Sequence, residues 1–304
     1  MKIGKLALKA SVHWGTVGDA KRRETFPPHG LYQEKLDIPY LEDGEELHKF
    51  DVYYADKTKD NYKNVAVVDF HGGAFLFGWR KNAYLLALEF LKRGYDFVAG
   101  DYIPVKEERG VNDLICDCAA CLAYIATHKQ ELGLEGKRFV LTGDSAGGLL
   151  VLDLQYAVDD KEYEKALGID LKGFCSEAVL VNCPVFDYEY NFEGRHMTKG
   201  AKRMMLGPRF SDYEYLNLYS PKTQFHRLSA PIFVSTCKKD FIRIHPVRLI
   251  EALKKRDDLF YKVVDIQEDD VYHVHNVNVP DQPASITVNE AMARFIVDAL
   301  HIGE

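Results

Sequence analysis

The sequence of 304 residues contains no run of about 20 apolar residues, the length that a membrane-spanning helix needs. It also lacks a long cluster of lysine and arginine, and its formal net charge is −7. A surface for binding nucleic-acid phosphates is therefore not expected. Residues 1–10 have neither the uninterrupted apolar core nor the small-residue cleavage site of a secretory signal. We therefore predict a cytoplasmic protein with no stable membrane insertion and no nucleic-acid partner.

Internal repeats and low-complexity tracts are absent as well, and cysteine is sparse, with six residues. Without a signal peptide these cysteines are expected to be reduced thiols. Cys118 and Cys121 form a C-x-x-C pattern, but it lies inside a predicted helix, 112–129, and not at a helix start, where a thiol pKa is lowered. Both cysteines share a helical face with Leu122 and Ile125. We therefore favour core packing over a redox or metal role.

Strand and helix patterns alternate from about residue 64 to the end, which indicates a mainly parallel sheet covered by helices on both faces. Before residue 60, two strand-like segments joined by a charged turn predict a hairpin, so the sheet begins antiparallel. The 47% hydrophobic content suits one α/β domain over residues 1–304. The expected strands are 35–41, 49–55, 64–70, 95–100, 139–141, 178–181, 231–237 and 259–266, and the expected helices are 82–93, 112–129, 285–300 and one directly after residue 145. Gly94 and Asn112 are the expected helix caps.

Two segments, 1–34 and 185–229, do not follow the alternation and are predicted to form a small cap or lid. Residues 5–12 could form an amphipathic helix, which we expect to pack on its own domain and not on a membrane. The second segment is rich in aromatic residues that could line a pocket: Phe186, Tyr188, Tyr190, Phe192, Phe210, Tyr213, Tyr215 and Tyr219. The alternative is a structural insertion that only packs on the core.

Ser145 stands in the sequence Gly143-Asp-Ser-Ala-Gly147, between a short apolar strand pattern and a helical pattern. A strand, a tight glycine turn, a serine and a helix are the parts of a nucleophile elbow. The two glycines are needed because a β-carbon on either side of so tight a turn would clash. Ser145 is therefore the predicted nucleophile.

A second glycine motif, His71-Gly-Gly-Ala-Phe, follows the predicted strand 64–70. With Gly-Asp-Ser-Ala-Gly-Gly at the elbow, it resembles the α/β-hydrolase superfamily, and within it the hormone-sensitive-lipase-like group of esterases and lipases. The resemblance covers about residues 35–300 and implies an α/β-hydrolase fold. It also implies that backbone N–H groups of Gly73 and Ala74, with Gly72 nearby, and of Ala146 form an oxyanion hole.

A serine nucleophile also needs a base and an acid that orients the base, and we expect this catalytic acid and base to follow later strands. Asp240 lies just past the carboxyl end of the strand 231–237, where parallel sheets assemble their sites, and Asp187 is the weaker alternative. His273 and His275 both lie between the last strand and the last helix. Aligning the H-x-aromatic pattern of the resembling esterases favours His273 as the base, and His275 stays an alternative. A His-x-His metal site lacks an obvious third ligand, so no metal or cofactor is expected.

The resulting order of Ser145, Asp240 and His273 is that of the α/β-hydrolases. We predict a serine carboxylesterase that cleaves small acyl esters through an acyl-enzyme intermediate. An amide hydrolase, such as an arylformamidase or a peptidase, would use the same triad. A catalytically silent ligand-binding protein on this fold is the alternative from another class. The sequence leaves a homodimer open.

Overall fold

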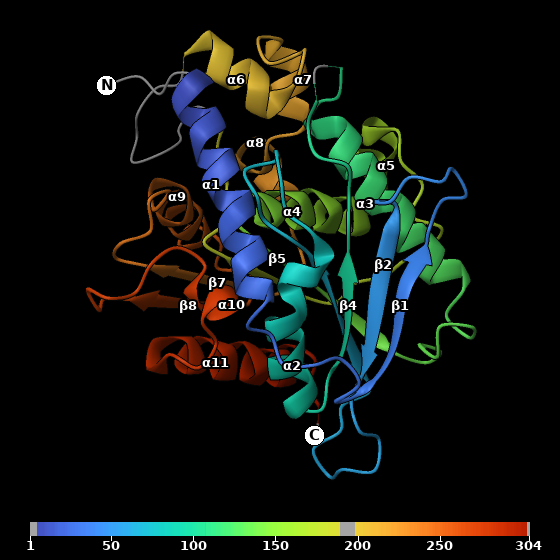
Figure 1. The fold of residues 1–304 in the computed structure, drawn as a ribbon. Coiled ribbons are helices and arrows are strands. Elements are labelled where there is room, and N and C mark those ends of the chain that lie inside the picture. The colour runs from blue at the N-terminus through green and yellow to red at the C-terminus, as the bar shows by residue number, and fades with distance from the viewer. Residues whose placement is uncertain (1–4, 107, 189–197, 303–304) are drawn as a thin grey trace.

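The computed structural model describes residues 5–106, 108–188 and 198–302, and these residues form an eight-stranded sheet at the centre of the molecule (Figure 1). The strand order is β1-β2-β4-β3-β5-β6-β7-β8. β1 pairs antiparallel with β2, and β2 with β4, while β3 to β8 run parallel to β4. The predicted mainly parallel sheet with an antiparallel start is confirmed. The strands are β1 (Gln33–Pro39), β2 (Lys49–Tyr54), β3 (Val65–Phe70), β4 (Asp96–Gly100), β5 (Arg138–Asp144), β6 (Val179–Asn182), β7 (Ile232–Cys237) and β8 (Tyr261–Ile266).

Helices cover both faces of the sheet and form two hydrophobic cores with it. The larger core includes side chains of α3, α4 and α9, and the other includes side chains of α2, α10 and α11. The central strand β3 is buried over its whole length, because it is covered on both faces. The helices are α1 (Lys5–Arg23), α2 (Tyr84–Lys92), α3 (Val111–Thr127), α4 (Ala146–Asp159), α5 (Lys161–Leu167), α6 (Lys199–Leu206), α7 (Tyr213–Leu218), α8 (Pro221–Gln224), α9 (Ile244–Leu253), α10 (His275–Asn278) and α11 (Pro283–Ala299), with single 3-10 turns η1 (Arg80–Ala83) and η2 (Phe225–Arg227).

One of the two predicted helix caps differs in the structure. Gly94 follows α2 with a φ of +87°, a conformation that suits glycine after a helix end. Asn112, in contrast, does not cap α3. The helix begins one residue earlier, and the carboxylate of Asp113 accepts the backbone N–H of Gly110 at 2.6 Å. Cys118 and Cys121 are fully buried within α3 and belong to the larger core, as expected.

α1, from the segment 1–34, and α6 and α7, from the segment 185–229, lie on the side of the sheet where the parallel strands end (Figure 1). The first segment contains α1, which continues well beyond the expected residues 5–12, and the second contains α6, α7 and α8. α1 contacts both α6 and η1, so it crosses this side of the molecule from one to the other. Within the described residues, no helix is both long and apolar enough to span a membrane.

Candidate active site

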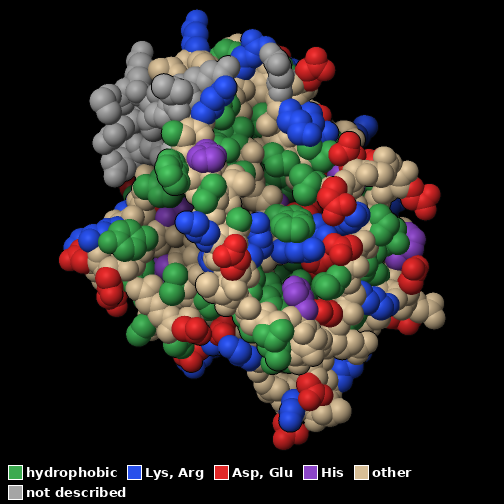
Figure 2. Space-filling model, in the orientation of Figure 1, with side chains coloured by type: hydrophobic (Ala, Val, Ile, Leu, Met, Phe, Trp, Pro, Cys, Tyr) green, Lys and Arg blue, Asp and Glu red, His purple; other side chains and the backbone are tan. Residues whose placement is uncertain are grey.

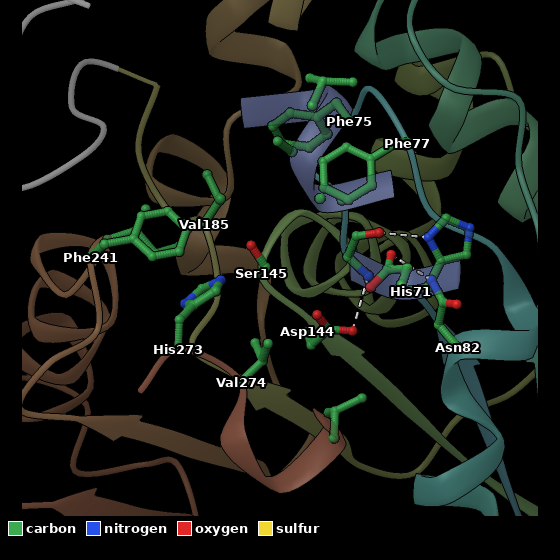
Figure 3. Close-up of a pocket in the computed structure, with 18 of the residues that line it drawn as sticks. His71, Phe75, Phe77, Asn82, Asp144, Ser145, Val185, Phe241, His273 and Val274 are labelled. Atoms are coloured by element: carbon green, nitrogen blue, oxygen red, sulfur yellow. Dashed lines mark hydrogen bonds between the residues drawn. The ribbon is translucent and has the colours of Figure 1, made fainter. Parts of the chain in front are cut away.

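A cavity of about 360 Å³ lies where β3 and β5 end, and its volume is in the usual range for a small-molecule site. One wall is a face of α1, and another is the loop that follows β3. Ser145 lines the cavity beside His273, whose imidazole is turned toward the serine in Figure 3. Met205 and Leu206 of α6 add apolar surface. The cavity therefore combines an apolar interior with a small set of polar groups.

Ser145 occupies a strained turn between β5 and α4. Its φ of 52° and ψ of −114° are unusual for a residue with a side chain. A β-carbon on Gly147 would lie 1.9 Å from the carbonyl oxygen of Phe70, and one on Gly143 would lie 2.6 Å from the backbone of Gly147. The Ser145 N–H donates to the Asn182 carbonyl at 2.9 Å, which ties the turn to the end of β6. These close approaches explain why both glycines are needed.

Asp240 and His273 are joined by a hydrogen bond of 2.7 Å between the carboxylate and Nδ1 of the imidazole. Asp240 is 4% exposed, and burial alone would raise its pKa. The nearby His273 and the N–H of Ile242 outweigh burial, so the pKa of Asp240 is lowered and the carboxylate stays ionised. With Nδ1 held by the carboxylate, Nε2 of His273 is the nitrogen left to face the cavity.

The loop after β3 carries three consecutive residues with positive φ, namely Gly73 at 132°, Ala74 at 53° and Phe75 at 66°. A β-carbon on Gly73 would lie 1.8 Å from the Phe77 carbonyl oxygen, so only glycine fits there. Among the described residues, the N–H groups of Gly73 and Ala74 donate to no protein atom. Ala146 is the first residue of α4, where a backbone N–H has no partner inside the helix.

The inclusion of Gly72 among the oxyanion donors is corrected by the structure. Its N–H donates to the carboxylate of Asp144 at 2.9 Å, so it is already occupied (Figure 3). A β-carbon on Gly72 would lie 2.3 Å from the second Asp144 oxygen. The glycine at this position therefore serves the contact between the two loops and does not add a free donor.

The imidazole of His71 packs against the loop that follows β3. The ring is 3% exposed, stacks on Tyr102 with 4.4 Å between ring centroids, and Nδ1 lies 2.6 Å from the Gly72 carbonyl oxygen. Burial lowers the pKa of His71, but the neighbouring Asp101 carboxylate and the Gly72 carbonyl raise it more, and the net pKa is raised. His71 therefore fixes the loop conformation.

Comparison with known sequences gives a family for this chain. The sequence model of the family described as BD-FAE matches residues 50–251, about two thirds of the chain. The chain belongs to the BD-FAE family. Lipase 2 of Moraxella sp. (strain TA144) is 36% identical over 86 residues, which is 28% of this chain. The match spans 20% of the length of that lipase.

Solved structures of esterases share the fold of this BD-FAE member. Esterase B from Lactobacillus rhamnosis, in a C6-C4 SN3 inhibited form, superposes with a TM-score of 0.84 at 19% identity, covering 98% of this chain and 97% of that one. Thermogutta terrifontis esterase 2, phosphonylated by sarin, gives a TM-score of 0.64 at 20% identity, covering 91% and 98%. The α/β-hydrolase fold and the resemblance to its esterase and lipase group are confirmed.

The two weaker candidates from the sequence lie elsewhere in this BD-FAE member. His275 is buried, its Nδ1 is 2.9 Å from the Ser285 hydroxyl, and burial lowers its pKa to about 4. It does not line the cavity. Asp187 does line the cavity, but its carboxylate binds Arg248 at 2.5 Å and Lys222 at 2.9 Å. The structure thus brings Ser145 and His273 to one cavity and Asp240 to His273.

Three groups near the cavity have the spacing of metal ligands. Donor atoms of Cys183, Asp240 and His273 lie within 4.8 Å of one another. Hydrogen bonding with Cys237 and burial raise the pKa of the Cys183 thiol, and a metal binds the thiolate form. Because Asp240 already holds His273, we interpret this set as a hydrogen-bonded support for the imidazole.

Several cavity residues were not anticipated from the sequence. Val12, Gly15, Asp19 and Arg22 recur every three or four positions and form the cavity-lining face of α1. Of the aromatic residues in 185–229, Tyr188 lines the cavity, whereas Tyr213 is exposed. Phe186, Tyr215 and Tyr219 are core residues and Phe210 packs against that core, and Tyr190 and Phe192 lie outside the described residues.

Proposed function

We propose that this BD-FAE member is a serine carboxylesterase that cleaves small acyl esters, with Ser145 as nucleophile, His273 as base and Asp240 as orienting acid. The observation that carries the proposal is the 2.7 Å hydrogen bond from His273 to Asp240, in a ring whose other edge faces the same cavity as Ser145. This is the connectivity by which serine hydrolases turn a weak nucleophile into a reactive one.

In the first half of the reaction, His273 removes the proton from the Ser145 hydroxyl as the oxygen attacks the ester carbonyl. Negative charge then develops on the former carbonyl oxygen. The unoccupied N–H groups of Gly73, Ala74 and Ala146 are the donors that would stabilise it. Protonated His273 donates its proton to the departing alcohol, which leaves an acyl group on Ser145.

In the second half, water takes the place of the alcohol. His273 removes a proton from this water, hydroxide adds to the acyl carbon, and the same N–H groups stabilise the second tetrahedral intermediate. Collapse releases the carboxylic acid and returns the proton to Ser145. Asp240 stays ionised throughout and fixes the tautomer of His273.

The apolar part of the cavity fits an acyl chain. Val12 of α1, Phe77 of the loop after β3, and Met205 and Leu206 of α6 all line it. These residues come largely from the segments 1–34 and 185–229, which we interpret as the cap of the site. Since α1 forms one wall of the cavity, a shift of this helix would change the access of substrate to Ser145.

The proposal is tested by hydrolysis of p-nitrophenyl acetate together with labelling by a phosphonate inhibitor, read as a mass increase of the intact protein. Ser145→Ala should abolish hydrolysis and labelling, and exposed Ser229→Ala is the matched control that should keep both. His273→Ala should lose activity and His275→Ala should retain it. Wild-type turnover in Ser145→Ala would exclude Ser145 as the nucleophile. A matched p-nitroacetanilide assay separates amide from ester hydrolysis.

A further inference from the structure

The face of α1 that lines the cavity is apolar near Val12 and polar near Arg22. Val12 and Arg22 are ten positions apart, which is about 15 Å along a helix. At the Val12 end, α1 lies against α6, whose Leu206 also lines the cavity. At the Arg22 end, Asp19 accepts a hydrogen bond of 2.9 Å from Asn82 of η1. The cavity is thus apolar at one end and polar at the other.

Charged side chains also gather on the outer surface near the Arg22 end of α1. In the orientation of Figure 1, Figure 2 shows Lys, Arg, Asp and Glu side chains over the C-terminal half of this helix. Among the described residues that line the cavity, Arg22 is the single Lys or Arg. It forms an ion pair with Asp19, which also lines the cavity.

The guanidinium of Arg22 is largely buried, and two of its three nitrogens have no hydrogen-bond partner among the described residues. Its side chain is 17% exposed, Nη2 lies 3.4 Å from an oxygen of Asp19, and the Phe26 ring lies 5.8 Å from the guanidinium carbon. Nε and Nη1 are both buried and have no hydrogen-bond partner among the described residues. Burial accordingly lowers the pKa of Arg22, although Asp19 and Asp144 act in the opposite direction.

Neither nearby carboxylate completes this arrangement. One oxygen of Asp19 faces Arg22 and the other accepts from Asn82, so both are in use. Asp144 accepts the Gly72 N–H at 2.9 Å, whereas the hydrogen bond of Arg22 goes to Asp19. A buried cation with two free donors costs stability unless a further acceptor joins it. Arg22 also lines the cavity, so we infer that an acceptor would approach its guanidinium from there.

We propose that Arg22 binds a carboxylate of the substrate, so that this site takes esters that carry a carboxylate in either their acyl part or their alcohol part. Arginine suits this task because its planar group makes charge-assisted hydrogen bonds to carboxylates. Arg22 and Asp144 both line the cavity, and Asp144 directly precedes the nucleophile. A short spacer would therefore connect the carboxylate to the ester at Ser145. The proposal rests on the esterase function proposed above.

The kinetic test compares an anionic ester with a neutral partner by acid release at constant pH. In the first pair, monomethyl glutarate carries a carboxylate on the acyl side and dimethyl glutarate is its neutral partner. In the second pair, acetoxyacetate carries a carboxylate on the alcohol side and ethyl acetate is its neutral partner. In Arg22→Gln, the ratio of kcat/KM for the anionic over the neutral ester should fall about tenfold or more in at least one pair. Exposed Lys21→Gln removes the same charge from the same helix turn and should change the ratio less than about twofold.

A binding test separates this proposal from the esterase proposal. Calorimetry of monomethyl glutarate and of acetoxyacetate with Ser145→Ala, and with Ser145→Ala combined with Arg22→Gln, measures the contact without turnover. We expect about tenfold weaker binding of at least one of them in the double variant. Unchanged kinetic ratios in both pairs, or an equal fall for charged and neutral esters, would overturn the role of Arg22. If the wild type cleaves no ester, the esterase proposal fails, and the calorimetry alone decides on Arg22.

Discussion

The carboxylate of Asp144 accepts the backbone N–H of Gly72 at 2.9 Å, and this contact joins the turn that carries Ser145 to the loop that carries Gly73 and Ala74. The two residues come from neighbouring parallel strands, β5 and β3, whose ends meet at the cavity. Because the nucleophile and the proposed oxyanion donors lie on these two loops, their relative position depends on this hydrogen bond.

Asp144→Ala should therefore lower both activity and stability. Loss of the buried acceptor leaves the Gly72 N–H unpaired, which costs about 1–3 kcal/mol. Displaced oxyanion donors should reduce kcat on p-nitrophenyl acetate by about 10- to 100-fold. Asp144→Asn keeps an oxygen acceptor and should retain more of both properties. Calorimetric unfolding and steady-state kinetics measure the two effects, and identical values for the two variants would contradict the proposed role of the hydrogen bond.

Asp240→Asn should reduce kcat by about 10³- to 10⁴-fold with little change in structure, because the amide no longer holds His273 in the productive tautomer. Asp187→Asn is the matched control, since Asp187 also lines the cavity but binds Arg248 and Lys222. Asp187→Asn should lower the melting temperature, and its loss of kcat should be much smaller than that of Asp240→Asn. A larger kcat loss in Asp187→Asn than in Asp240→Asn would reverse the assignment of the acid.

The sequence predicted the central sheet and the loops that carry the site because these depend on local patterns. β3 and β5 are short apolar runs, and each is followed by a glycine motif whose steric need is local. The cytoplasmic location and a homodimer stay predictions. The role of Gly72 was missed because the partner of its N–H is a side chain 72 positions away.

The cavity face of α1 was missed for a different reason. The helix packs against α6 and η1, and its outer surface includes Trp14, which is 70% exposed. Its inner face, in turn, includes Asp19 and Arg22. The amphipathic pattern expected over residues 5–12 therefore does not extend to Asp19 and Arg22. Only the folded chain shows which side faces the site.

His275 should make the protein less stable in mild acid. Its pKa is lowered by burial to about 4, below the usual value near 6.5, so the unfolded chain binds the proton more readily. The free energy of unfolding should be fully present above about pH 6.5 and should fall as the pH drops toward about 4. His275→Asn should show a shallower fall over this window. His226→Asn, at an exposed histidine, should follow the wild type, and a wild-type slope in His275→Asn would contradict the assignment.

Gly15 sets the distance between α1 and the loop after β3, and we expect it to limit the length of the acyl chain. A β-carbon there would lie 2.6 Å from the Phe77 ring, and both residues line the cavity. Gly15→Val should therefore push the ring into the cavity and narrow its apolar end. The ratio of kcat/KM for p-nitrophenyl octanoate over acetate should fall by about tenfold, since each buried methylene is worth about 0.8 kcal/mol.

Gly18 offers the matched control on the same helix. A β-carbon on Gly18 would meet no atom within 4 Å, so Gly18→Val changes the helix propensity of α1 without entering the cavity. Any general loosening of α1 should affect both variants alike. A selective loss on octanoate in Gly15→Val alone would therefore locate the acyl chain between Gly15 and Phe77. An equal loss in both variants, or none in either, would place the acyl chain elsewhere in the cavity.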